Sequence, residues 1–160
     1  MNLSAAYRLA LVIAAAAVVT PAQARTHRCA KKPTYAQQLQ GLGRRIDDDT
    51  GRLPREPHIE ALAEDYHVPI TAIEDLRAKG KGWGDITLRL SFAEALSAKD
   101  RAHFDTVSDA LDEINRRSLA PGAALAKEYR LNRNHILDRS ERSRAAMARL
   151  NPSVAKNLPN

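Results

Sequence analysis

The stretch from Ile86 to Leu96 (ITLRLSFAEAL) constrains the fold more than any other part of the sequence. Its apolar residues fall on nearly every side of a helix rather than on one stripe, and such a helix is buried by its neighbours. We therefore predict that this segment is the central helix of the fold. Aromatic residues make up only 4% of the chain, so aliphatic side chains must fill most of the core.

Apolar residues recur at helical spacing on both sides of this segment. The predicted helices span roughly residues 34–48, 59–66, 70–76, 86–96, 104–114, 123–129 and 134–150. Thr34 with Gln37, and Ser97 with Asp100, have the spacing of capping boxes. No segment shows the pattern of a strand. We predict an all-α fold, a small bundle of five to seven short helices that forms one domain over residues 34–150.

An internal repeat lies within this domain. The segment Ala61–Val68 (ALAEDYHV) aligns without gaps on Ala124–Leu131 (ALAKEYRL), 63 positions later. Each copy is followed by a short turn and a further helical segment, so we predict two similar hairpins of the helix-turn-helix kind. Duplication and convergence both account for the repeat.

Residues 62–77 resemble the helix-turn-helix of bacterial regulators through the pattern Leu-Ala-x-x-Tyr-x-Val followed by Ile-x-x-Leu. The resemblance implies that the second helix reads the DNA major groove. In this copy, however, that helix has no base-reading side chain in its first turn, and Glu74 and Asp75 would repel phosphate. The second copy is more basic, with Asn132, Arg133, Asn134 and His135. Nucleic-acid binding is therefore an alternative that the sequence does not favour.

The first 24 residues have the features of a secretory signal peptide. Arg8 precedes an apolar run from Leu9 to Val19, and the segment ends in Pro21-Ala22-Gln23-Ala24, a small-x-small cleavage pattern. The apolar run is too short for a transmembrane helix. We predict cleavage after Ala24, a periplasmic or secreted mature chain, and no transmembrane segment after cleavage.

Arg8 is the single charged residue of this segment, so the mature chain carries 24 basic and 19 acidic side chains and a net charge of +5. This surplus favours an anionic partner in the cell envelope, although an unknown protein partner remains open. Residues 25–33 are predicted to be a basic, disordered N-terminus, and residues 151–160 a frayed tail. Cys29 is the only cysteine, so in an oxidising compartment it could form a disulfide-linked dimer.

The segment Leu76–Ile86 (LRAKGKGWGDI) is the most distinctive of the chain. It resembles a motif, Leu-Arg-x-x-Gly-x-Gly-Trp-Gly-Glu/Asp-Ile, of small and mostly exported bacterial proteins of uncharacterised function. The resemblance covers residues 66–96 and implies no activity. Physically, Gly80 can end one helix with positive φ, Asp85 can cap the next, and Trp83 can pack between the two.

The same turn is also a candidate contact surface. Glycine-rich backbone before a helix exposes amide donors to an anion, and two lysines add positive charge. We predict that the arginine-rich face of the last helix is also part of this contact surface. The predicted contact residues are Lys79, Gly80, Lys81, Gly82, Trp83, Gly84, Asp85, Arg139 and Arg142.

Cleavage after Ala24 would create a second candidate site, at the new N-terminus. The α-amine of Arg25, the amides of Thr26 and His27, and the His27 imidazole can surround Cu(II) or Ni(II) in a plane, with Cys29 close by. Otherwise the sequence indicates no metal or cofactor. No catalytic motif occurs, so we predict a non-enzymatic binding or interaction protein of the cell envelope, with copper or nickel binding as a further alternative.

Overall fold

The computed structural model describes residues 32–50, 55–117 and 121–150. These ranges contain seven helices and no strand, so the predicted all-α bundle is confirmed. The helices are α1 (Tyr35–Thr50), α2 (Glu56–Tyr66), α3 (Ile70–Ala78), α4 (Trp83–Lys99), α5 (Val107–Arg116), α6 (Ala123–Glu128) and α7 (Arg133–Arg149). The predicted signal peptide, most of the basic N-terminus and the predicted tail lie outside the described residues.

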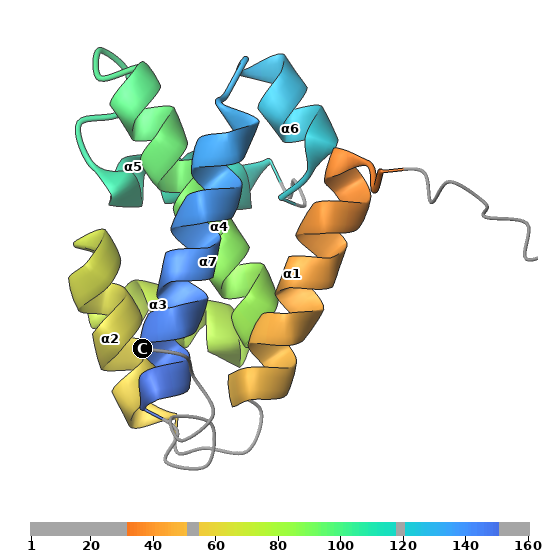
Figure 1. Cartoon of the computed structure of the whole chain (residues 1–160). Helices are drawn as coiled ribbons and strands as arrows, with labels where there is room; N and C mark the ends of the chain where they lie inside the picture. The colour runs from red at the N-terminus through yellow and green to blue at the C-terminus, as the bar shows by residue number, and fades with distance from the viewer. Residues whose placement is uncertain (1–31, 51–54, 118–120, 151–160) are drawn as a thin grey trace, which may run out of the picture. The chain divides into compact units, whose positions relative to one another are not determined.

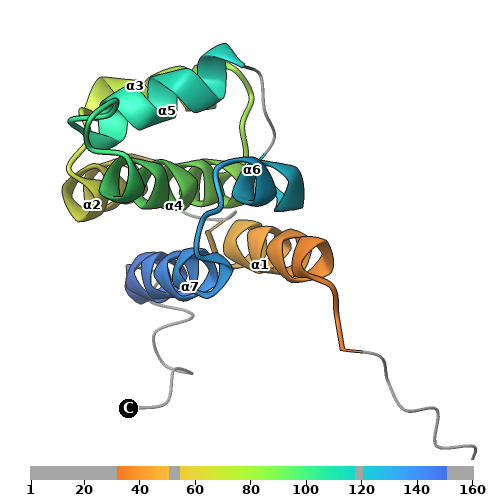
Figure 2. The same ribbon diagram turned by 90° about the horizontal axis from the view of Figure 1, so that it is seen from above.

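The described helices lie in three layers (Figure 2). Helices α1 and α7 form one outer layer, α2, α4 and α6 form the middle layer, and α3 and α5 form the other outer layer. Helices α1 and α7 run parallel to each other, because Tyr35 lies under Arg133 near one end and Asp49 pairs with Arg144 near the other. Figure 1 shows these two helices in front of α4.

Helix α4 is the central element, as predicted. Ile86 and Leu90 lie on one side of the helix and Phe92 on nearly the opposite side, yet all three are fully buried. Helices α1, α2, α5 and α7 all pack against it. Burial of the apolar residues of α4, which the hydrophobic effect favours, therefore involves contacts with most of the chain.

The ends of the helices only partly follow the predictions. Thr34 and Gln37 form the predicted capping box of α1, with the Thr34 amide donating to Gln37 Oε1 over 2.8 Å. The prediction for Ser97 is wrong: it lies inside α4, and its hydroxyl donates to the Glu94 carbonyl at 3.3 Å. The capping box that begins α5 is formed by Thr106 and Asp109.

The two predicted hairpins, α2–α3 and α6–α7, have the same backbone at their turns. His67 and Arg130, which the repeat aligns, have φ of 52° and 50°. The next amide in each copy donates back to the aligned alanine carbonyl, at 3.0 Å in the first hairpin and 2.8 Å in the second. The second helices begin at Ile70 and Arg133, again 63 residues apart. The repeat in the sequence is therefore also a repeat in structure.

Helices α1 and α4 approach each other through two glycines. A Cβ atom on Gly84 would lie 2.2 Å from the carbonyl oxygen of Gly43, a separation that no side chain can occupy. Backbone atoms on both sides of this contact leave nothing flexible to move away. Gly84 is therefore required for the two helices to pack at this distance.

We predict that Gly84→Ala lowers the free energy of unfolding by about 3 kcal/mol or more, because the added methyl group forces α1 and α4 apart. Gly41→Ala is the matched control, since a Cβ at that helical position meets no atom within 4 Å. It should stabilise the chain by about 0.5–1 kcal/mol. Chemical denaturation measures both, and equal tolerance of the two substitutions would contradict the close packing.

Candidate functional site

The glycine-tryptophan turn is built into the fold. Gly80 has a φ of 76° after the end of α3, as predicted. Asp85, however, does not cap the next helix. Helix α4 begins earlier than predicted, at Trp83, and Gly82 is its N-cap residue. The acceptor comes from α1 instead, since Asp47 Oδ1 accepts a hydrogen bond from the Gly84 amide at 2.9 Å.

Asp47 therefore occupies the position that an anion would take at this turn. Its carboxylate also lies against Gly82, where a Cβ atom would be 2.9 Å from Asp47 Oδ1. A carboxylate at a helix N-terminus satisfies free amides and interacts favourably with the helix dipole. The predicted anion site is thus filled by the chain's own side chain.

Trp83 packs between neighbouring helices, as predicted for a structural residue. It is 5% exposed. Its ring lies 5.4 Å from the ring of His58 on α2, and the Arg77 guanidinium on α3 lies 4.6 Å from its centre. The His58 imidazole is itself buried against the indole.

The charged residues of this turn differ in exposure. Lys79 is exposed, whereas Lys81 lies 3.8 Å from Asp85, which also binds Arg89 at 2.9 Å. Arg139, predicted as part of an exposed arginine face on the last helix, is only 7% exposed, while Arg142 is exposed. Of the predicted contact residues, Lys79 and Arg142 thus offer accessible charges without an ion pair in the described part of the chain.

Arg139 joins α7 to α2 and α4 instead of facing solvent. Its guanidinium binds Asp65 Oδ2 and Glu94 Oε2, each at 2.7 Å, and donates to the Asp65 carbonyl at 2.7 Å. It also stacks on the Tyr66 ring at 4.0 Å. Planar guanidinium groups suit such multiple contacts, which lysine could not reproduce.

A chain of buried hydroxyl groups continues from this arginine. Ser143 Oγ lies 2.8 Å from Asp65 Oδ2 and 2.9 Å from Tyr66 Oη. Tyr66 Oη lies 2.6 Å from Ser91 Oγ, which accepts from Ser140 Oγ at 2.7 Å. The hydroxyl groups of Ser140, Ser91, Tyr66 and Ser143 thus form one connected chain that ends on the Asp65 carboxylate.

Burial and neighbouring charges shift the pKa values of Asp65, Arg139 and Tyr66. Burial raises the pKa of Asp65, but hydrogen bonds from Arg139 and Ser143 and the nearby arginine charges outweigh it, so the pKa is lowered. Burial likewise opposes the charge on Arg139, yet its carboxylate partners raise its pKa further above the usual range. Burial raises the pKa of Tyr66 to about 12. At neutral pH the network therefore holds an ionised pair beside neutral hydroxyl groups.

Four exposed cations gather at the other hairpin, and we name this surface the basic turn. Lys99 Nζ at the end of α4 donates to the Arg130 carbonyl at 2.7 Å, which places it against the α6–α7 turn. The other members follow closely along the chain. The basic turn consists of Lys99, Lys127, Arg130 and Arg133.

Local sequence patterns point to Arg133 but not to the other three members of the basic turn. Lys127 and Arg130 stand within the repeat, and comparing the two copies position by position would have found them, since they replace Glu64 and His67. No local signal identifies Lys99, because its place beside Arg130 depends on the packing of α4 against the second hairpin.

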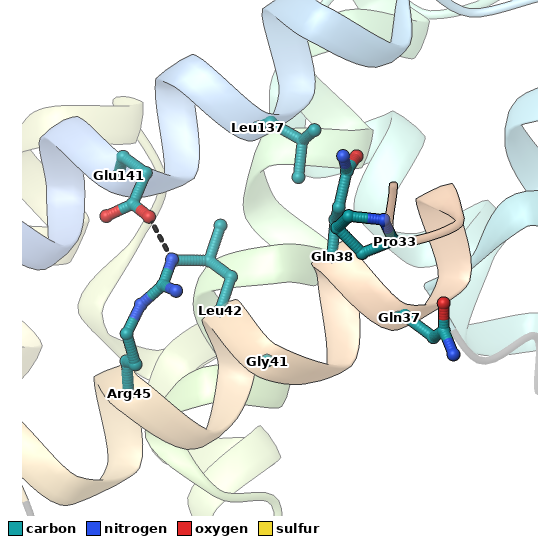
Figure 3. Close-up of a pocket in the computed structure, with 8 residues that line it drawn as sticks. All are labelled: Pro33, Gln37, Gln38, Gly41, Leu42, Arg45, Leu137 and Glu141. Carbon is teal, nitrogen blue, oxygen red and sulfur yellow. Dashed lines mark hydrogen bonds and ion pairs between the residues drawn. The ribbon is translucent and has the colours of Figure 1, made fainter. Parts of the chain in front are cut away.

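A shallow groove of about 330 Å³ lies between α1 and α7 (Figure 3). Leu42 and Leu137 provide its apolar lining, and Arg45 pairs with Glu141 across one side. This pairing leaves the groove without an unpaired charge among its lining side chains. It could accept an apolar side chain, but its chemistry selects no particular ligand.

The predicted copper site lies outside the described residues, as do all four of its members: Arg25, Thr26, His27 and Cys29. Across the described ranges, no three His, Cys, Asp or Glu side chains are placed to hold a metal ion. Nor does any helix in these ranges have both the length and the apolar character that crossing a bilayer requires.

Comparisons with protein-family models, curated proteins and solved structures found no match to this chain.

We predict that Asp65→Asn destabilises the chain by about 2–3 kcal/mol at neutral pH, because it leaves Arg139 with one carboxylate partner. The folded-state pKa of Asp65 is lowered, so its contribution is present above the ordinary value of 3.8 and is lost as the pH falls through the folded pKa.

Urea denaturation of both chains between pH 2 and pH 7 tests this prediction. The difference between wild type and Asp65→Asn should shrink as the solution becomes acidic. Asp112→Asn, at an exposed position on α5, is the control and should show a small difference throughout. A difference for Asp65→Asn that stays constant with pH would show that the pairing does not depend on its charge.

Proposed function

We propose that this chain is an exported, non-enzymatic binding protein of the cell envelope that contacts an anionic partner through the basic turn. The observation that carries the proposal is the contrast between the two hairpins. Their turns share one backbone geometry, yet Glu64, His67 and Ile70 of the first correspond to Lys127, Arg130 and Arg133 of the second. Packing requirements alone do not account for three cations at exposed, aligned positions.

The cations of the basic turn are accessible for a partner. Lys127, Arg130 and Arg133 are exposed and form no ion pair with any described residue. The carboxylate of Glu128, which lies among them in the sequence, binds Arg117 at 2.8 Å. This pairing leaves the positive charge of the basic turn largely uncompensated, and such a surface attracts anions.

We propose no enzymatic activity because of where the reactive side chains lie. Ser143 lies beside a carboxylate, as a nucleophile does, but its side chain is 1% exposed and its oxygen already contacts Asp65, Tyr66 and Arg139. A substrate could not reach it without separating α2 from α7. Export rests on the signal-peptide features of residues 1–24.

Nucleic-acid binding is the second candidate, and one observation favours it. Asn134 and His135 are exposed beside Arg133 on the first turn of α7, where helix-turn-helix proteins place the side chains that read bases. Export would separate such a protein from chromosomal DNA, so we rank this candidate below an envelope partner.

The test measures binding of fluorescent inorganic polyphosphate, by anisotropy, to the chain that begins at Arg25. We expect binding that weakens as salt is raised, because each phosphate contact releases a counterion. Lys127→Ala with Arg130→Asn should weaken binding about tenfold or more at low salt. Asparagine is chosen because it tolerates the left-handed conformation of Arg130.

The matched control is Lys79→Ala with Arg142→Ala, which removes the same charge from the surfaces that the sequence indicated. We expect it to change the affinity less than threefold. A larger effect of the control than of the basic-turn variant would assign the contact to those surfaces instead. Duplex DNA that binds more tightly than polyphosphate of equal charge would favour the second candidate.

A further inference from the structure

We propose that the anionic partner is the surface of a bilayer that contains anionic lipids; this inference rests on the proposed function of the basic turn. Three features of the described residues support a broad anionic surface over a single bound anion: the use of the backbone amides, the spread of the cations, and the charge of the opposite hairpin.

Four backbone amides near the basic turn are already bonded within the chain. Asn132 Oδ1 accepts from the amides of Asn134 and His135, at 3.1 Å and 3.2 Å. The Arg130 amide donates to the Lys127 carbonyl, and the Leu131 amide to that of Ala126. Binding sites for a single phosphate commonly use such free amides at the start of a helix. With these four amides occupied, we assign recognition to the side chains.

The cations of the basic turn come from separate elements. Lys99 ends α4, Lys127 lies in α6, and Arg133 begins α7 with its guanidinium 5.2 Å from the centre of the Tyr35 ring. This stacking and the bond from Lys99 to the Arg130 carbonyl anchor two of the cations at different points of the fold. Separate anionic headgroups in a plane can each meet one cation, whereas one phosphate could contact only some of them.

The first hairpin carries the opposite charge. Glu56, Glu60 and Glu64 recur at intervals of four residues along α2 and are all exposed. Figure 1 shows α2 and α3 at one end of the described bundle, and α6 with the start of α7 at the other. An anionic plane would attract the basic turn and repel the acidic hairpin, so the charge distribution orients the protein on the surface.

The experiment measures partitioning of the chain that begins at Arg25 onto vesicles, by sedimentation. Vesicles of phosphatidylcholine alone are compared with vesicles that contain phosphatidylglycerol. We expect binding to the second kind only. Lys127→Ala with Arg130→Asn should lower the partition coefficient about thirtyfold, since each cation near an anionic surface contributes about fivefold. Lys79→Ala with Arg142→Ala should lower it less than threefold.

Soluble glycerol phosphate separates a headgroup site from a surface. Millimolar glycerol phosphate should leave vesicle binding unchanged, and full competition would overturn the inference in favour of a single-anion site. Equal losses in the two double variants would also overturn it, because net charge alone would then explain binding. Binding of polyphosphate without binding of vesicles overturns this inference and leaves the proposed function intact. Failure to bind either overturns both.

Discussion

The arrangement of α7 depends on the pairing of Arg139, whose guanidinium points into the bundle. A helix with this many arginines would be expected to lie at the edge of a bundle with its charges in solvent. Instead, one guanidinium turns inward and is matched by Asp65 of α2 and Glu94 of α4. Burying a charge is costly unless it is paired and hydrogen-bonded, so α7 can pack in this register only where both carboxylates meet it. The register in turn fixes where the basic turn is presented.

Helix α4 connects this network to the rest of the fold. On one side it supplies Glu94 and Ser91 to the contacts with α7. At its beginning, Gly84 allows α1 to approach, and Asp47 of α1 binds the free amide there. The glycine-tryptophan turn therefore joins α1, α3 and α4. Its distinctive sequence has a structural explanation in these contacts, and they leave little of its backbone for a ligand.

The sequence was sufficient to predict the helices and to identify the central one, because helical periodicity and the apolar character of residues 86–96 are local properties. It also identified the repeat, whose two turns share a left-handed residue. It could not place Arg139 or Asp47, since each is defined by a partner that is distant in the chain. For the same reason, the local pattern favoured Asp85 as the cap of α4. The basic turn was partly visible in the second copy, but Lys99 joins it only through packing.

We propose that two hairpins of one backbone geometry differ in use, with the second serving as the contact surface. Amide hydrogen exchange along both hairpins, with and without inorganic polyphosphate, tests it most directly. We predict slower exchange over residues 127–135 and no change over the aligned residues 64–72. Slower exchange over residues 64–72 or 79–85, with none over 127–135, would contradict it.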